Sequence, residues 1–111
     1  MNHNMKLMNA PFLSMKEGEK DIETRFYDEK RRAISIGDTI TFEHIETKEL
    51  LIKKVVNLHV FNTFEELFRS FPAQRFGWED TEDLINNRYD ESIGYTAEKE
   101  HQFGVVGIVL K

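Results

Sequence analysis

The β-type segments of this chain limit its fold more than any other feature. Ile22, Thr24 and Phe26 share one face of an alternating pattern over 22–26, which predicts a half-buried strand, and the alternation returns over 37–45, GDTITFEHI. β-Branched residues dominate the longer run at 50–61, LLIKKVVNLHVF, and the closing run at 103–111, FGVVGIVLK. The intervening ETKE predicts a hairpin turn. A sheet with antiparallel neighbours should therefore form the framework.

Short helices are expected around this sheet. Residues 5–8 suggest a short strand, and residues 10–17 predict a helix that Asn9 would cap and Gly18 would end. The polar connection 27–33, YDEKRRA, has room for a helical turn.

Further helix signals follow the longest strand. Thr63 and Glu66 have capping-box spacing at the start of a helix that Pro72 limits. Two more helices are predicted at 78–89 and 96–103, the latter capped by its first residue. This order of elements predicts an α+β fold built on a curved sheet or small barrel.

Composition narrows the class of protein. The 111 residues fit one domain, placed over 1–111, and a 40% apolar share with nine Phe supports a single packed core. The absence of cysteine excludes disulfides, thiol catalysis and cysteine zinc sites. No apolar run approaches the roughly 20 residues of a membrane span, and no signal peptide is evident. We therefore expect a soluble, cytoplasmic protein without a membrane partner.

The charge is acidic and unevenly distributed. The net charge of −5 argues against broad, salt-sensitive binding to a phosphate backbone. Residues 20–32, however, hold five basic and four acidic side chains, whereas residues 79–100 hold eight acidic and two basic ones. An anionic ligand would therefore favour the first region.

Common catalytic and cofactor motifs are missing. The chain has neither a G-x-x-x-x-G-K phosphate loop nor a G-x-G-x-x-G turn, so no cofactor is expected. The four histidines lack metal-ligand spacing, so no metal site is expected either. They are His3, His44, His59 and His101.

Three charged residues in the first predicted long strand are the exception. Glu23 and Arg25 point to the same face of a regular strand, while Lys20 has the opposite parity and can join them only if it precedes the strand or follows a bulge. A partly desolvated lysine can act as a general base, and a neighbouring carboxylate can orient a water or a substrate amine. The alternative is a solvated strand face with a surface salt bridge.

Several motifs together resemble the ASCH family (activating signal cointegrator homology), a branch of the PUA-like fold. They are G-x-K-x-x-E-x-R from Gly18 to Arg25, the Gly-Asp pair at 37–38, the FEELF segment at 64–68 and the ending FGVVGI. The resemblance extends from Met5 to Lys111. It implies a PUA-like small mixed β-barrel flanked by short helices, with a cleft beside the charged segment that binds RNA or a modified nucleoside.

The resemblance also implies a possible enzyme. Some small bacterial ASCH proteins hydrolyse N4-acetylcytidine with a Lys, a Thr and a Glu. The lysine matches Lys20, the threonine position holds Glu23 with Thr24 beside it, and the glutamate falls within 74–79. Lys20 and Glu23 are therefore the candidate catalytic residues, with Glu23 activating a water and Lys20 stabilising the oxyanion.

Other residues are candidates for ligand contact. Besides Arg25 and Thr24, the aromatic side chains of Tyr27 and Trp78 could stack on a base. The Arg31–Arg32 pair reads as a solvated loop, with a phosphate contact as the alternative. Three hypotheses remain: a module that binds RNA or a modified nucleoside, an amidohydrolase, and a structural or interaction domain. The first is favoured.

Overall fold

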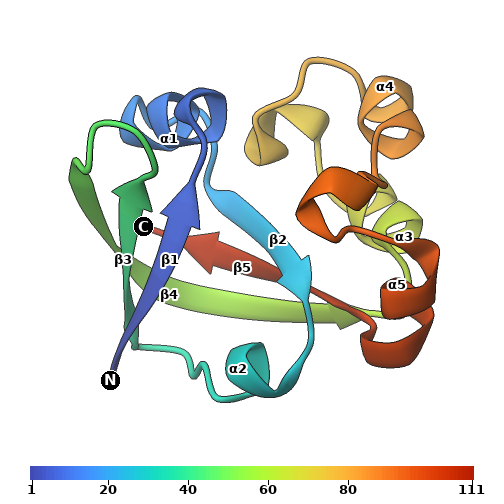
Figure 1. The fold of residues 1–111 in the computed structure, drawn as a ribbon, viewed down its shortest axis with the longest axis horizontal. Coiled ribbons are helices and arrows are strands. Elements are labelled where there is room, and N and C mark those ends of the chain that lie inside the picture. Colours follow the sequence, from blue (N-terminus) through green and yellow to red (C-terminus); the bar gives the residue numbers. More distant parts are fainter.

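A computed structural model describes residues 1–111 and shows one curved sheet of five strands (Figure 1). The strands are β1 (Asn2–Leu7), β2 (Ile22–Phe26), β3 (Thr39–His44), β4 (Leu50–Phe61) and β5 (Val105–Leu110). Their order in the sheet is β1-β3-β4-β5-β2, with β1 parallel to β3 and the other neighbours antiparallel. The predicted α+β fold with a small mixed barrel is confirmed as a half-barrel.

The long strand β4 joins the two halves of the sheet. Its first part, 50–54, pairs with β3, and its second part, 55–61, pairs with β5. The register shifts between Val55 and Asn57 in the pairing with β5. Such a bulge bends a strand and increases its twist. The bend lets one continuous strand belong to both walls of the half-barrel.

Seven short helices surround the sheet. They are α1 (Asn9–Lys16), α2 (Glu29–Arg32), α3 (Phe64–Arg69), η1 (Ala73–Phe76), α4 (Thr81–Asn86), η2 (Glu91–Ile93) and α5 (Ala97–Phe103). None is long and apolar enough to cross a membrane. Helices α3, α4 and α5 gather at one end of the sheet, whereas α1 lies at the other (Figure 1).

Two of the three predicted helix caps are confirmed. Thr63 and Thr96 cap α3 and α5 as predicted, because each hydroxyl accepts the backbone N–H three residues later. The prediction for Asn9 is wrong: the N-cap position of α1 is Met8, which makes no side-chain cap bond. The Asn9 side chain instead lies 2.9 Å from the ring nitrogen Nε2 of the buried His44.

The predicted helix at 78–89 is shorter in the structure. It is limited to α4, and the Asp80 side chain accepts the N–H of Asp83 at its start. The preceding segment forms the separate turn η1, which ends at Gly77 in the left-handed conformation, with φ 85°. A left-handed residue stops a helix, so η1 and α4 are separate helices.

The apolar core has two parts of 11 buried residues each. One includes Phe12 and Phe42 and lies toward β1, β3 and α1. The other includes Phe64 and Phe76 and fixes α3, η1 and α4 against β2 and β5. Strand β5 is buried along its whole length and contributes to both parts. The surface between these two packed units holds the charged segment of β2.

Candidate functional site

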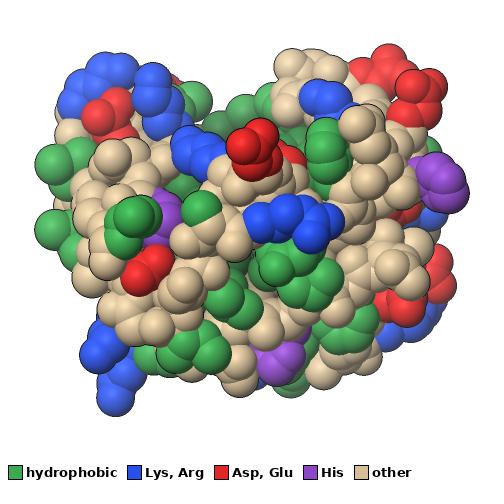
Figure 2. All heavy atoms as spheres, turned by 90° about the horizontal axis from the view of Figure 1, so that it is seen from below, with side chains coloured by type: hydrophobic (Ala, Val, Ile, Leu, Met, Phe, Trp, Pro, Cys, Tyr) green, Lys and Arg blue, Asp and Glu red, His purple; other side chains and the backbone are tan.

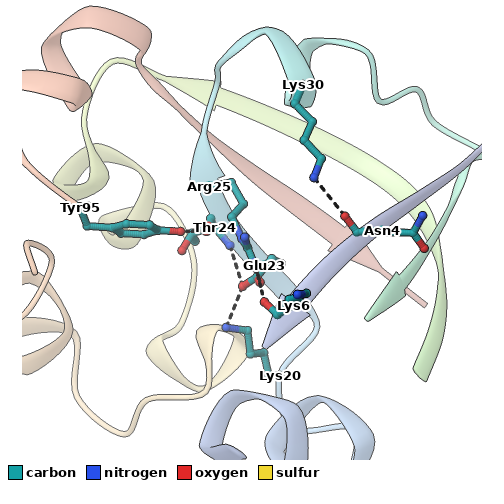
Figure 3. A network of polar contacts seen from close by, with 8 residues as sticks. All are labelled: Asn4, Lys6, Lys20, Glu23, Thr24, Arg25, Lys30 and Tyr95. Carbon is teal, nitrogen blue, oxygen red and sulfur yellow. Dashed lines mark hydrogen bonds and ion pairs between the residues drawn. The ribbon is translucent and has the colours of Figure 1, made fainter. Parts of the chain in front are cut away.

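Lys20, Glu23 and Arg25 form one ion-paired group (Figure 3). Lys20 lies before β2, which is the position required for it to join the other two. Its Nζ is 3.0 Å from Glu23 Oε1. Arg25 donates to Glu23 Oε2 from Nε at 3.2 Å and from Nη2 at 2.9 Å. The carboxylate therefore has a cationic partner on each oxygen.

This ionic group is buried. Glu23 is 3% exposed and Lys20 9% exposed, and the backbone N–H of Thr24 donates to Glu23 Oε1. Burial raises the pKa of Glu23, but the charges of Lys20 and Arg25 and their hydrogen bonds outweigh it and hold the pKa at about 2. Burial likewise lowers the pKa of Arg25, and the Glu23 charge outweighs it and raises that pKa. Glu23 and Arg25 are therefore both charged at neutral pH.

Arg25 also closes the opening of the half-barrel. Strands β1 and β2 are the two outer strands of the sheet and are not paired with each other. Arg25 Nη2 donates to the carbonyl oxygen of Lys6 at 3.0 Å, and Lys30 Nζ donates to that of Asn4 at 3.2 Å (Figure 3). Cationic side chains thus satisfy the free carbonyl groups of β1 where a strand would otherwise pair.

A cavity of about 680 Å³ opens beside the ionic group, and Figure 2 shows the surface hollowed between two lobes. One wall comes from the end of β1 and the start of α1, and the other from 76–78 and 93–95. The lining residues are Lys6, Leu7, Met8, Ala10, Pro11, Lys20, Glu23, Thr24, Arg25, Ile45, Phe76, Gly77, Trp78, Ile93 and Tyr95. The charges therefore face a concave site and not a convex, wetted strand face.

Gly77 shapes this cavity. A Cβ atom at Gly77 would lie 3.3 Å from Ser14 Oγ and 3.4 Å from Lys20 Cδ, and the residue has a φ of 85°. Only glycine adopts this backbone without strain. The close approach supports the stem of Lys20 on one side and places Trp78, which is 39% exposed, at the cavity.

The structure brings most of the predicted site residues together. Thr24 and Trp78 line the cavity with the ionic group, whereas Tyr27 does not. The Tyr27 ring packs against the core, and the guanidinium of Arg32 lies 4.3 Å from its centre. Segment 74–79 contributes no carboxylate to the lining, so Glu23 is the only acidic residue there.

Tyr95 is an aromatic lining residue that sequence reasoning missed. Its ring stacks on Phe64 at 5.8 Å between centroids, and its hydroxyl donates to the carbonyl oxygen of Thr24 at 3.4 Å. Burial raises its pKa. The local sequence around Tyr95 has no strand or helix periodicity. The bridge between Asp90 and Tyr95 closes the loop, and the contacts of Tyr95 with Thr24 and Phe26 hold it against β2. No signal in the sequence would have indicated this position.

No group of three or more His, Cys, Asp or Glu side chains is placed to hold a metal ion. The polar groups at the cavity include the donors of Lys20 and Arg25 and the carboxylate of Glu23. Together, the donors of Lys20 and Arg25 exceed what one carboxylate can accept.

Comparisons with known proteins agree with this geometry. The sequence profile of the ASCH domain matches residues 5–111. Among solved structures, hypothetical protein PH0355, from Pyrococcus, is 32% identical with a TM-score of 0.83, covering 100% of this chain and 98% of its own. Protein PF0455 from Pyrococcus furiosus is 34% identical with a TM-score of 0.71, covering 100% and 96%. No curated protein matches the sequence. The chain belongs to the ASCH domain family.

Proposed function

We propose that the cavity beside Lys20, Glu23 and Arg25 binds the base of RNA or of a modified nucleoside. The observation that carries the proposal is the burial of an ionic, donor-rich group in the wall of a 680 Å³ cavity with aromatic sides. Ligand cavities usually occupy about 300–1,000 Å³ and combine apolar walls with a few placed polar groups. ASCH domains are generally thought to bind RNA. The protein would meet either ligand in the cytoplasm.

The three ionic residues have different roles in this proposal. Glu23 is a positioning residue, because both of its oxygens are already occupied by Lys20 and Arg25. Lys20 and Arg25 keep further N–H groups for acceptor atoms of a base, such as carbonyl oxygens and ring nitrogens. An analogue without those acceptors would leave buried donors unpaired, which opposes its binding.

Aromatic side chains supply the second part of recognition. Trp78 is partly exposed at the cavity, and Tyr95 lines the same space from the 93–95 segment. Stacking of a base on an aromatic ring contributes about 1–3 kcal/mol. The net charge of −5 favours such short-range contacts over long-range attraction to a phosphate backbone.

Hydrolysis of an acylated nucleoside, such as N4-acetylcytidine, is the second candidate. It is favoured by the presence of Lys20 and Thr24 in one cavity lining, since Lys20 could stabilise an oxyanion. Glu23 is poorly suited as the base that activates water, because a carboxylate with a pKa of about 2 and two cationic partners accepts a proton weakly. Recognition without turnover is therefore the better-supported function.

Trp78 offers a direct test, because it is the only tryptophan in the chain and lies at the cavity. Its fluorescence is followed while cytidine, N4-acetylcytidine and short RNAs are added at two salt concentrations. Binding should change the emission. Lys20→Met should lower the binding affinity at least tenfold, which is the loss expected for a charge-assisted hydrogen bond.

A control variant and a product assay complete this test. Lys16→Met is the matched control, because Lys16 is exposed and pairs with Glu49 outside the cavity. Chromatography of the N4-acetylcytidine samples shows whether cytidine and acetate form. If no nucleoside or RNA binds up to millimolar concentration, the proposal is wrong; steady product formation that depends on Lys20 would favour the hydrolase.

A further inference from the structure

A second hollow, of about 360 Å³, adjoins the cavity and shares Lys6 and Arg25 with it. It lies on the other side of the bridge between β1 and β2, next to α2. The lining residues are Asn4, Met5, Lys6, Arg25, Lys30, Arg31, Thr41, Glu43 and Leu50. Two adjacent hollows therefore lie along the open edge of the half-barrel.

The second hollow is strongly cationic in an acidic protein. Its lining contains four basic side chains and one carboxylate, that of Glu43, which lies 3.9 Å from Lys48. Arg25 and Arg31 are paired with Glu23 and Asp28, each at 2.9 Å. Lys6 and Lys30 have no acidic partner within ion-pair distance.

Several donors in this lining are available or unsatisfied. Lys30 donates one N–H to the carbonyl oxygen of Asn4. An ammonium group has three N–H donors, so two remain. The Arg31 Nε is buried without an acceptor. Cationic side chains without an acidic partner, one from β1 and one from α2, match an anion with several oxygens better than a neutral group.

The two hollows border the same two residues, Lys6 and Arg25. In Figure 3, Arg25 lies between Lys20 on one side and Lys30 on the other. We propose that the second hollow, beside Lys30 and Arg31, binds a phosphate group attached to the nucleoside held in the first. The ligand is then a nucleotide, either a free monophosphate or a residue of an RNA strand. This inference rests on the proposed function and adds the phosphate to it.

The test compares each nucleoside with its phosphorylated form. The four common ribonucleosides and N4-acetylcytidine are titrated by calorimetry, each also as its 5′- and 3′-monophosphate, together with trinucleotides. A phosphate should tighten binding about tenfold. Lys30→Gln should remove most of that gain while changing the affinity for the neutral nucleoside less than about twofold. For a trinucleotide it should also lower the slope of log K against log salt by about 0.7.

Lys54→Gln is the matched control, because Lys54 is an exposed lysine of β4 that lines neither hollow. Tightening by a monophosphate would identify a free nucleotide, and tightening by trinucleotides alone an internal phosphodiester; both support the inference. It is overturned if nucleosides bind and phosphate adds nothing in any form, or if the gain survives Lys30→Gln combined with Arg31→Gln. If neither nucleosides nor nucleotides bind, the proposed function falls with it.

Discussion

Replacing Glu23 with glutamine tests whether the ionic group is held together by its carboxylate. Glutamine keeps the size of the side chain and removes its charge. Lys20 and Arg25 would then remain largely buried without a counter-charge. Breaking a buried ion pair by removal of one partner usually destabilises a protein by about 3–5 kcal/mol.

The pKa of Glu23 gives a second measure of the same effect. It falls from 4.5 to about 2 on folding. At about 1.4 kcal/mol for each unit, this difference corresponds to about 3 kcal/mol of stabilisation by the ionised carboxylate. Because the folded-state pKa is the lower one, the stabilisation is fully present above pH 4.5 and is lost as the pH falls toward 2.

Urea unfolding measures both expectations. At pH 7, Glu23→Gln should lower the free energy of unfolding by about 3 kcal/mol. The difference from wild type should shrink steadily between pH 4.5 and pH 2. Glu49→Gln is the control, because the Lys16–Glu49 pair is about half exposed, and it should cost less than about 1 kcal/mol.

Two results would contradict this account of Glu23. A loss below about 1 kcal/mol at pH 7 would mean that Lys20 and Arg25 tolerate burial without it. A loss that stays constant down to pH 2.5 would mean that the carboxylate does not titrate as its ion pairs require. In either case Glu23 could not be the residue that positions the two donors.

Three further predictions concern the backbone, the caps and the aromatic wall. Gly104→Ala should lower the free energy of unfolding by about 1–3 kcal/mol, because its φ is 69° and a Cβ would lie 3.0 Å from the Phe61 carbonyl oxygen. In the same urea experiment Gly18→Ala should cost less, since nothing lies within 4 Å of its Cβ position. Thr63→Ala should cost about 1 kcal/mol by thermal or urea unfolding, through loss of the cap of α3. Trp78→Ala should weaken nucleoside binding, measured by calorimetry, by about 1–3 kcal/mol without a comparable loss of stability.

Local patterns were sufficient to predict most of the strands. The alternation over 22–26 and the β-branched runs at 50–61 and 103–111 correspond to β2, β4 and β5. Capping chemistry located α3, because the Thr63 hydroxyl and its N–H partner are three residues apart in any sequence. Signals of this kind depend on neighbours in the chain, so a sequence carries them completely.

The predictions that were wrong concern features that depend on distant residues. Asn9 looks like a cap, but the buried ring of His44, 35 residues away, takes its side chain. The helix expected from Trp78 begins only at Thr81, after η1 has ended at Gly77. A propensity describes what a segment can do alone, and tertiary contacts decide between its options.

The residues of the candidate site show the same difference between local and long-range signals. Spacing located Lys20, Glu23 and Arg25 and stated the condition under which they meet, because all three lie in one short segment. Tyr95 reaches the same cavity from a loop 71 residues away from Thr24 and could not be found from spacing. The sequence suggests Tyr27 as an aromatic residue that could stack on a base, but its ring packs against the core.

Arg25 shows why function and stability must be separated with care at this site. It holds Glu23 by two hydrogen bonds and also bridges the opening of the half-barrel through Lys6. A substitution at Arg25 would therefore loosen the fold and remove a ligand donor at the same time, and lost binding would not distinguish the two. Lys20 pairs only with Glu23, so Lys20→Met leaves both the Arg25–Glu23 pair and the bridge to β1 in place. If that variant retains its unfolding free energy to within about 1 kcal/mol and still loses nucleoside binding, the loss belongs to recognition.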